Sequence, residues 1–70
     1  MYKIDFFEIQ EQTEVYRFSK NMHFSNFDFL IDWIYEFLKT SNVWKNKNMI
    51  VKIKTIPTPQ QATIYYYAEQ

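Results

Sequence analysis

The longest regular pattern of apolar residues in the sequence spans residues 25–40 and has a helical period. Apolar side chains at intervals of three and four residues form one stripe along a helix. Ser25 is a good N-cap residue, and Asp28 three residues later gives a short-armed version of the capping box. Phe24 and Phe29 have the spacing of a hydrophobic staple across that cap. The expected apolar stripe consists of Phe27, Leu30, Ile31, Ile34, Phe37 and Leu38.

The residues before the helix predict a β-hairpin. Residues 2–9 alternate between apolar and polar side chains, which is typical of a strand. The alternation breaks at Phe6 and Phe7, where either a β-bulge or burial on both faces would explain the change. Residues 10–13 are polar and form the expected loop, and residues 14–20 form the second strand. In that second strand the alternation places Tyr16 and Phe18 on one face and Val15 and Arg17 on the other.

The residues after the helix predict a second hairpin, with strands at 49–56 and 62–68. Pro57 and Pro59 have no N–H to donate to a ladder, so they are expected to end the third strand. Before these strands, Val43 and Trp44 either extend the helix by a turn or fold back over the core. The strand residues expected on one common face are Met49, Val51 and Ile53 in the third strand, and Ile64 and Tyr66 in the fourth.

The predicted fold is therefore a single small α+β domain over residues 1–70, in the order β-β-α-β-β. The simplest arrangement is a four-stranded, mostly antiparallel sheet with the helix packed across one face. The sequence leaves open how the two hairpins pair with each other. One sheet face then has no covering layer, and the residues expected on it include Lys52, Lys54, Tyr65 and Tyr67.

Composition limits how such a domain is stabilised and where it acts. The chain has no cysteine and no glycine, so disulfides and Asn-Gly hairpin turns are excluded. A core of this size supplies only about 3–5 kcal/mol, and oligomerisation is the remaining common reinforcement. The sequence contains neither a signal peptide nor an apolar run of membrane-spanning length. We expect a cytoplasmic protein of a bacterial host cell, with no membrane contact.

Aromatic residues are numerous for a chain of this length, with seven Phe, six Tyr and two Trp. A domain this small buries only about 60% of its chain surface, so several rings are expected at the surface, where they favour binding. On the predicted helix the acidic side chains share one line, and two large rings lie beside them. An ordinary solvated helix face is the alternative interpretation. The expected protein-binding residues are Asp28, Phe29, Asp32, Trp33 and Glu36.

Charge is segregated although the net charge is zero. Seven of the eight acidic residues lie within residues 1–38, whereas residues 39–68 hold five Lys and no acid. Lysines among tyrosines suit single-stranded nucleic acid, which gives a second candidate surface. Lysines at sheet edges that prevent aggregation are the alternative interpretation. This candidate nucleic-acid surface consists of Lys45, Lys47, Lys52, Lys54, Tyr65 and Tyr67, with Tyr66 between the last two.

No motif for catalysis, cofactor binding or metal binding is present in the sequence. His23 is the single histidine, and there is no cysteine to complete a metal site with it. Ser25 is better explained as a helix cap than as a nucleophile. We therefore expect a protein that is not an enzyme and that uses no cofactor or metal.

The profile as a whole, a tiny glycine-free chain with segregated charge and surplus aromatic rings, resembles small proteins of phages and other mobile elements. Such proteins bind and block a larger host protein, and anti-CRISPR and anti-restriction proteins are examples of the class. This resemblance implies a non-enzymatic inhibitor or adaptor whose partner is a host defence or nucleic-acid-processing protein. A nucleic-acid-binding module is the second hypothesis. A homodimer that pairs its open sheet faces or edges is the third.

Overall fold

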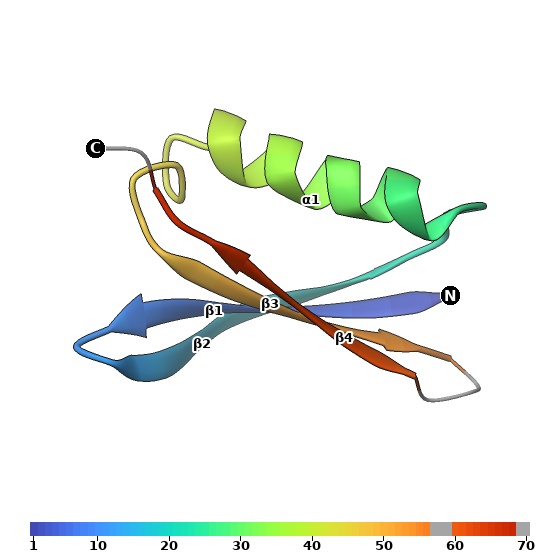
Figure 1. The fold of residues 1–70 in the computed structure, drawn as a ribbon, viewed down its shortest axis with the longest axis horizontal. Helices are drawn as coiled ribbons and strands as arrows, with labels where there is room; N and C mark the ends of the chain where they lie inside the picture. The colour runs from blue at the N-terminus through green and yellow to red at the C-terminus, as the bar shows by residue number, and fades with distance from the viewer. Residues whose placement is uncertain (57–59, 69–70) are drawn as a thin grey trace.

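A computed structural model describes residues 1–56 and 60–68 of the chain. It confirms the predicted order, with four antiparallel strands in one sheet and one helix on one side of it (Figure 1). The expected strand end at Pro57 and Pro59 lies outside the described residues. No helix within the described part of the chain has the length and apolar character needed to cross a membrane. The elements are β1 (Tyr2–Gln10), β2 (Thr13–Met22), α1 (Phe27–Thr40), β3 (Met49–Thr55) and β4 (Gln61–Tyr66).

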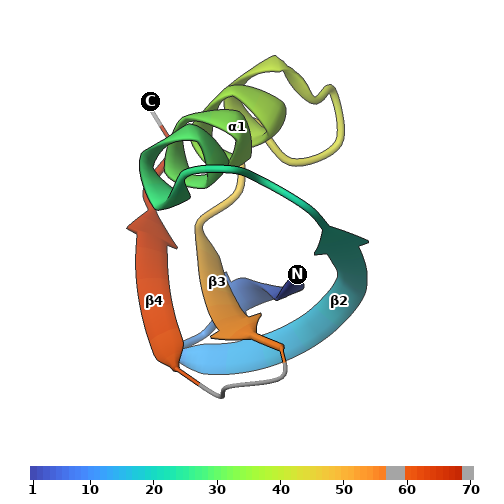
Figure 2. The same ribbon diagram turned by 90° about the vertical axis from the view of Figure 1, so that its right-hand side faces the viewer.

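The strand order is β2-β1-β3-β4, so the first strand of each hairpin lies in the centre of the sheet. The two hairpins join where β1 pairs with β3, with Phe6 opposite Val51. Figure 2 shows that the sheet is strongly curved and that α1 lies across its concave side, above β3 and β4. No described segment covers the opposite, convex face. The edge strands are β2 and β4.

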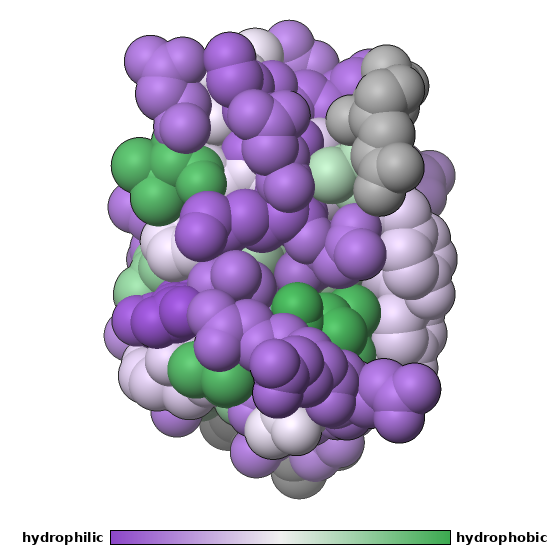
Figure 3. Space-filling model, turned by 90° about the vertical axis from the view of Figure 1, so that its left-hand side faces the viewer, coloured by the Kyte–Doolittle hydropathy of each residue, from purple (hydrophilic) through white to green (hydrophobic). Residues whose placement is uncertain are grey.

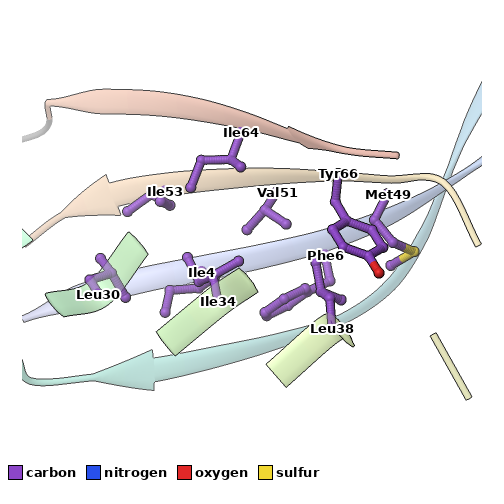
Figure 4. Packing of buried hydrophobic residues seen from close by; sticks show 10 residues of the cluster. All are labelled: Ile4, Phe6, Leu30, Ile34, Leu38, Met49, Val51, Ile53, Ile64 and Tyr66. Carbon is purple, nitrogen blue, oxygen red and sulfur yellow. The ribbon is translucent and has the colours of Figure 1, made fainter. Parts of the chain in front are cut away.

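The core lies between the concave face and α1 (Figure 4). The predicted helix stripe supplies Leu30, Ile34 and Leu38, which are fully buried. Phe27 was expected in this stripe but is 39% exposed, because it lies at the first turn, where its ring contacts that of Tyr2 at 6.1 Å. The strands contribute alternate residues, as the sequence predicts for β3 and β4. The strand residues of the core are Ile4, Phe6, Met49, Val51, Ile53, Ile64 and Tyr66.

The helix begins one residue later than predicted. Asn26 is the N-cap, and its side chain accepts a hydrogen bond of 2.7 Å from the backbone N–H of Asp28. The predicted Ser25 cap is therefore wrong, and with it the capping box to Asp28 and the staple between Phe24 and Phe29. Asn caps a helix as well as Ser does, so the sequence alone did not separate two adjacent candidates. Phe24 packs instead against the ring of Trp33, at 6.3 Å.

The irregularity predicted near Phe6 and Phe7 is a β-bulge, and it lies in β2 rather than in β1. Phe6 is opposite Phe18 and Phe7 is opposite Tyr16, which leaves Arg17 as the extra residue. A bulge shifts the side-chain alternation by one residue. Tyr16 therefore lies on the convex side against Phe7, and the predicted common face for Tyr16 and Phe18 is wrong.

The first hairpin turns through only two residues, Glu11 and Gln12, where a loop over residues 10–13 was expected. Both residues have positive φ angles, 49° and 67°. Such a turn fits the twist of a hairpin, but it normally uses Asn or Gly because other residues are strained there. The chain thus makes a two-residue turn without glycine, and strain is the consequence.

After α1 the chain folds back so that Trp44 packs against the core, whereas Val43 is exposed, so the second alternative holds for Trp44 alone. The Ser41 side chain accepts hydrogen bonds of 3.2 Å from the backbone N–H groups of Val43 and Trp44. The Trp44 ring then packs against that of Phe18, with the centroids 5.5 Å apart. This contact closes the core beside β2, which the helix axis does not cover (Figure 2).

Candidate functional site

The outward side of α1 carries a line of carboxylates. Asp28, Asp32 and Glu36 are all exposed and are spaced by one helical turn. The salt bridges within the described residues involve only Glu8 and Glu14 on the acidic side, so none of them neutralises this line. Like charges at this spacing repel each other in the free protein. A cationic partner would relieve that repulsion.

Phe29 stands beside these carboxylates with 59% of its surface exposed. A large apolar side chain that points outward from a helix contributes little to the fold. Complete burial of a Phe side chain is worth about 1.5–3 kcal/mol, and much of that gain remains available to a binding partner. We use the term acidic helix face for Asp28, Phe29, Asp32 and Glu36.

Trp33 belongs to the packed side of the helix rather than to its exposed surface. Its ring stacks on Phe37, with centroids 5.1 Å apart and an angle of 13° between the planes. The ring of Phe24 lies 6.3 Å from it. The structure therefore brings four of the five predicted protein-binding residues together and places Trp33 at their border, partly buried.

The candidate nucleic-acid surface is divided in the structure. Lys52, Lys54 and Tyr65 lie on the convex face of the sheet and are exposed. The Lys52 ammonium is 2.8 Å from the Glu14 carboxylate and 4.7 Å from the centre of the Phe7 ring. Its charge is thus partly compensated within the molecule.

Tyr67 lies beside Tyr65, whereas Lys45 and Lys47 lie elsewhere. Lys45 lines a shallow hollow of about 350 Å³ together with Lys39, Tyr66 and Tyr67. Lys47 points to the buried Glu8 carboxylate, at 3.5 Å. Tyr66 is buried and donates a hydrogen bond of 3.2 Å from its hydroxyl group to the Lys45 carbonyl.

Two features of the structure escaped the sequence analysis. One is an apolar row across the whole convex face, formed by Tyr16, Phe7, Ile50 and Tyr65 in the order β2, β1, β3, β4. Only the strand order creates it, because the four residues come from four separate strands. The Tyr67 ring lies parallel to that of Tyr65 at one end, 6.5 Å away with 8° between the planes.

The other feature is Glu8, a charged residue only 7% exposed. Its Oε1 atom accepts a hydrogen bond of 2.9 Å from Arg17 Nε, and the same oxygen forms a salt bridge of 2.7 Å with Arg17 Nη2. Burial raises the pKa of the carboxyl group, but hydrogen bonds from Gln10 and Arg17 and the positive charges of Lys47 and Arg17 outweigh it, so the pKa lies below its usual value of 4.5. Glu8 continues the two-residue period of the core residues Ile4 and Phe6 in β1, and that period was the signal for its inward orientation.

Nothing in the described part of the chain gathers three residues of the types that hold metal ions. His23 is exposed in the connection between β2 and α1.

The end of the molecule that carries the C-terminus of α1 and the β1–β2 turn is mostly hydrophilic, with separate small apolar patches (Figure 3). Compared with protein-family models, curated proteins and solved structures, the chain matches none of them.

Proposed function

We propose that this chain is a non-enzymatic inhibitor or adaptor that binds a larger protein through the acidic helix face. The observation that carries the proposal is the exposed Phe29 ring beside three exposed carboxylates without a salt bridge. Aromatic anchors supply most of the energy of protein interfaces, and charges around them steer association. The acidic helix face combines both on one rigid element.

The mechanism is occlusion of a basic surface. Phe29 enters an apolar pocket of the partner, while the carboxylates pair with its Lys or Arg side chains. Successive carboxylates are about 6 Å apart along the helix, so the line can imitate a row of nucleic-acid phosphates. The proposed partner is a host defence or nucleic-acid-processing protein, such as a CRISPR or restriction component, whose basic groove the helix occupies.

The test is capture of partners from host lysate with the tagged chain, followed by mass spectrometry. The decisive variants are Phe29→Ala, the single reversal Asp32→Lys, which should weaken capture, and the pair Asp32→Lys with Glu36→Lys. Glu11→Lys is the matched control for the single reversal Asp32→Lys, since each changes the net charge by the same amount. Glu11 lies in the β1–β2 turn, away from the helix.

The proposal requires a protein that is captured by the wild type and by Glu11→Lys, also after nuclease treatment. Phe29→Ala and the double reversal should both lose it, and binding should weaken as salt screens the charges. A partner that the double reversal still binds at low salt would exclude the acidic helix face. Capture that is lost after nuclease treatment would show that nucleic acid mediates it, and would favour the convex face as the binding surface.

Nucleic-acid binding is the second candidate, and the parallel rings of Tyr65 and Tyr67 favour it. Exposed rings with nearby lysines form a stacking platform for single-stranded bases. It ranks second because Lys47 and Lys52 already pair with Glu8 and Glu14. Binding that falls steeply with salt, and that is lost on combined Lys52→Ala, Lys54→Ala and Tyr65→Ala, is the expected result. Absence of binding to single- and double-stranded nucleic acid at low salt would exclude it.

A further inference from the structure

We propose that β4 pairs with β4 of a second copy of this chain, so that two four-stranded sheets form one continuous antiparallel sheet. β4 is an edge strand, and no other described segment lies beside its outer side (Figures 1 and 2). The inference is independent of the acidic helix face, because it uses a different element and needs no other partner.

The backbone groups available for pairing follow from the β3–β4 register. The Thr55 N–H donates to the Gln60 carbonyl at 3.1 Å, and antiparallel ladders alternate between hydrogen-bonded and non-bonded pairs. The alternate residues Ala62, Ile64 and Tyr66 therefore bond to β3. The residues whose N–H and C=O groups point outward are Gln61, Thr63 and Tyr65.

The two edges of the sheet differ in how far they are protected against pairing. β2 contains the bulge at Arg17 and carries Glu14 and Lys20. Bulges and charged side chains are the usual devices that prevent edge pairing. β4, with the sequence QATIYY, has six residues without a bulge, a proline or a charge, and it is rich in strand-forming side chains. Only β4 is open to a second strand.

The register of the pairing is determined by symmetry. A two-fold axis makes residue i of one copy face residue j of the other and j face i. When Thr63 faces the partner's Thr63, the outward residues of the two copies pair only with one another. Gln61 of each copy then faces Tyr65 of the other. All three outward residues then donate and accept, and the facing threonines are a favourable cross-strand pair.

Charge does not oppose this arrangement. Lys52 is opposite Thr63 in the β3–β4 ladder. In the dimer three strand spacings separate it from the partner's Lys52, which is about 14 Å. That distance exceeds the Debye length of about 10 Å at 0.1 M salt, so the repulsion is largely screened.

Apolar side chains border β4 on both sides of the sheet. On the convex side Tyr65 is exposed, and on the concave side Tyr35 of α1 is 38% exposed and contacts the ring of Tyr66. Ile31 lies one helical turn before Tyr35 on the same side of the helix and is partly buried. A second copy at β4 would cover these side chains, which the small core of a single chain leaves exposed.

The test measures the mass of the full chain in solution over a range of concentrations, by sedimentation or light scattering. Thr63→Pro removes an N–H that points outward, so it should block pairing while the β3–β4 ladder stays intact. Thr63→Val is the matched control, because it keeps both backbone groups and the branched side chain. Circular dichroism of each variant reports whether the fold persists. Amide hydrogen exchange of the wild type, resolved by residue, is the second measurement.

The proposal expects twice the chain mass of 8.7 kDa for the wild type and for Thr63→Val, and the single mass for a folded Thr63→Pro. The amides of Gln61, Thr63 and Tyr65 should exchange at least tenfold more slowly at high than at low protein concentration. A mass of 8.7 kDa at all concentrations would overturn the proposal. So would a dimer that Thr63→Pro leaves intact, or one in which these three amides exchange freely. If Thr63→Pro does not fold, the comparison of wild-type amide exchange at high and low protein concentration tests the proposal by itself.

Discussion

Replacement of Glu8 by Gln should destabilise the fold because it removes the negative charge from a buried hydrogen-bonded group. The Oε1 atom of Glu8 accepts a hydrogen bond of 2.9 Å from Arg17 Nε and lies 2.7 Å from Nη2 in a salt bridge, and Oε2 lies 3.5 Å from the Lys47 ammonium. Gln keeps an acceptor for the charged Arg17 guanidinium, but it loses the negative charge and with it the attraction to Arg17 and Lys47.

The expected loss follows from these contacts. Hydrogen bonds to charged groups contribute about 1.5–3 kcal/mol, and removal of the anion loses the part of this energy that comes from attraction between opposite charges. The Arg17 side chain is 34% exposed, so water recovers part of the interaction. We therefore expect Glu8→Gln to lower the free energy of unfolding by about 1–2 kcal/mol, which is a large share of the stability of a domain this small. Each kcal/mol should lower the melting temperature by roughly 4–8 °C.

Urea denaturation of a double-mutant cycle measures this interaction directly. The cycle consists of Glu8→Gln, Arg17→Gln and the double variant, and it should give a coupling energy of about 1 kcal/mol. The matched control is the cycle for Glu14 and Lys52, whose charged atoms are 2.8 Å apart but whose side chains are both 45% exposed. Exposed pairs contribute about 0.2–1 kcal/mol, so this coupling should be smaller. Equal coupling energies in the two cycles would refute the argument that burial strengthens the Glu8 pair.

Three further predictions follow from the corrected details of the fold. Folding lowers the pKa of Glu8, so the stabilisation by its charge is complete above the usual pKa of 4.5 and is lost as the pH falls through the folded value. Acidification should therefore reduce the difference in unfolding free energy between the wild type and Glu8→Gln. A difference that stays constant with pH would contradict the lowered pKa. Replacing Glu11 and Gln12 by Asn and Gly should stabilise the fold by about 0.5–2 kcal/mol, because Asn and Gly adopt positive φ angles more readily. Urea denaturation measures the change, and a lower midpoint for the variant would exclude strain in this turn. Asn26→Ala should lower the free energy of unfolding by about 0.5–2 kcal/mol, whereas Ser25→Ala should leave it nearly unchanged. A larger loss in Ser25→Ala than in Asn26→Ala would show that Ser25 is the cap.

The order of elements and the faces of β3 and β4 were determined by the sequence alone, because hydrophobic period and turn residues are local properties. The helix stripe of Leu30, Ile34 and Leu38 was predictable for the same reason. So was the acidic helix face, since residues four apart on a helix share a side whatever it packs against. The local pattern could not choose between Ser25 and Asn26, because Ser and Asn are both preferred N-cap residues.

The strand order, the bulge in β2 and the burial of Glu8 were decided only by the tertiary structure. Each depends on which strand lies beside β1, and strands far apart in the sequence pair according to the fit of whole faces. The convex row of Tyr16, Phe7, Ile50 and Tyr65 exists because the order is β2-β1-β3-β4. The same order places β4 at an edge of the sheet, a property that no single strand of the sequence could reveal.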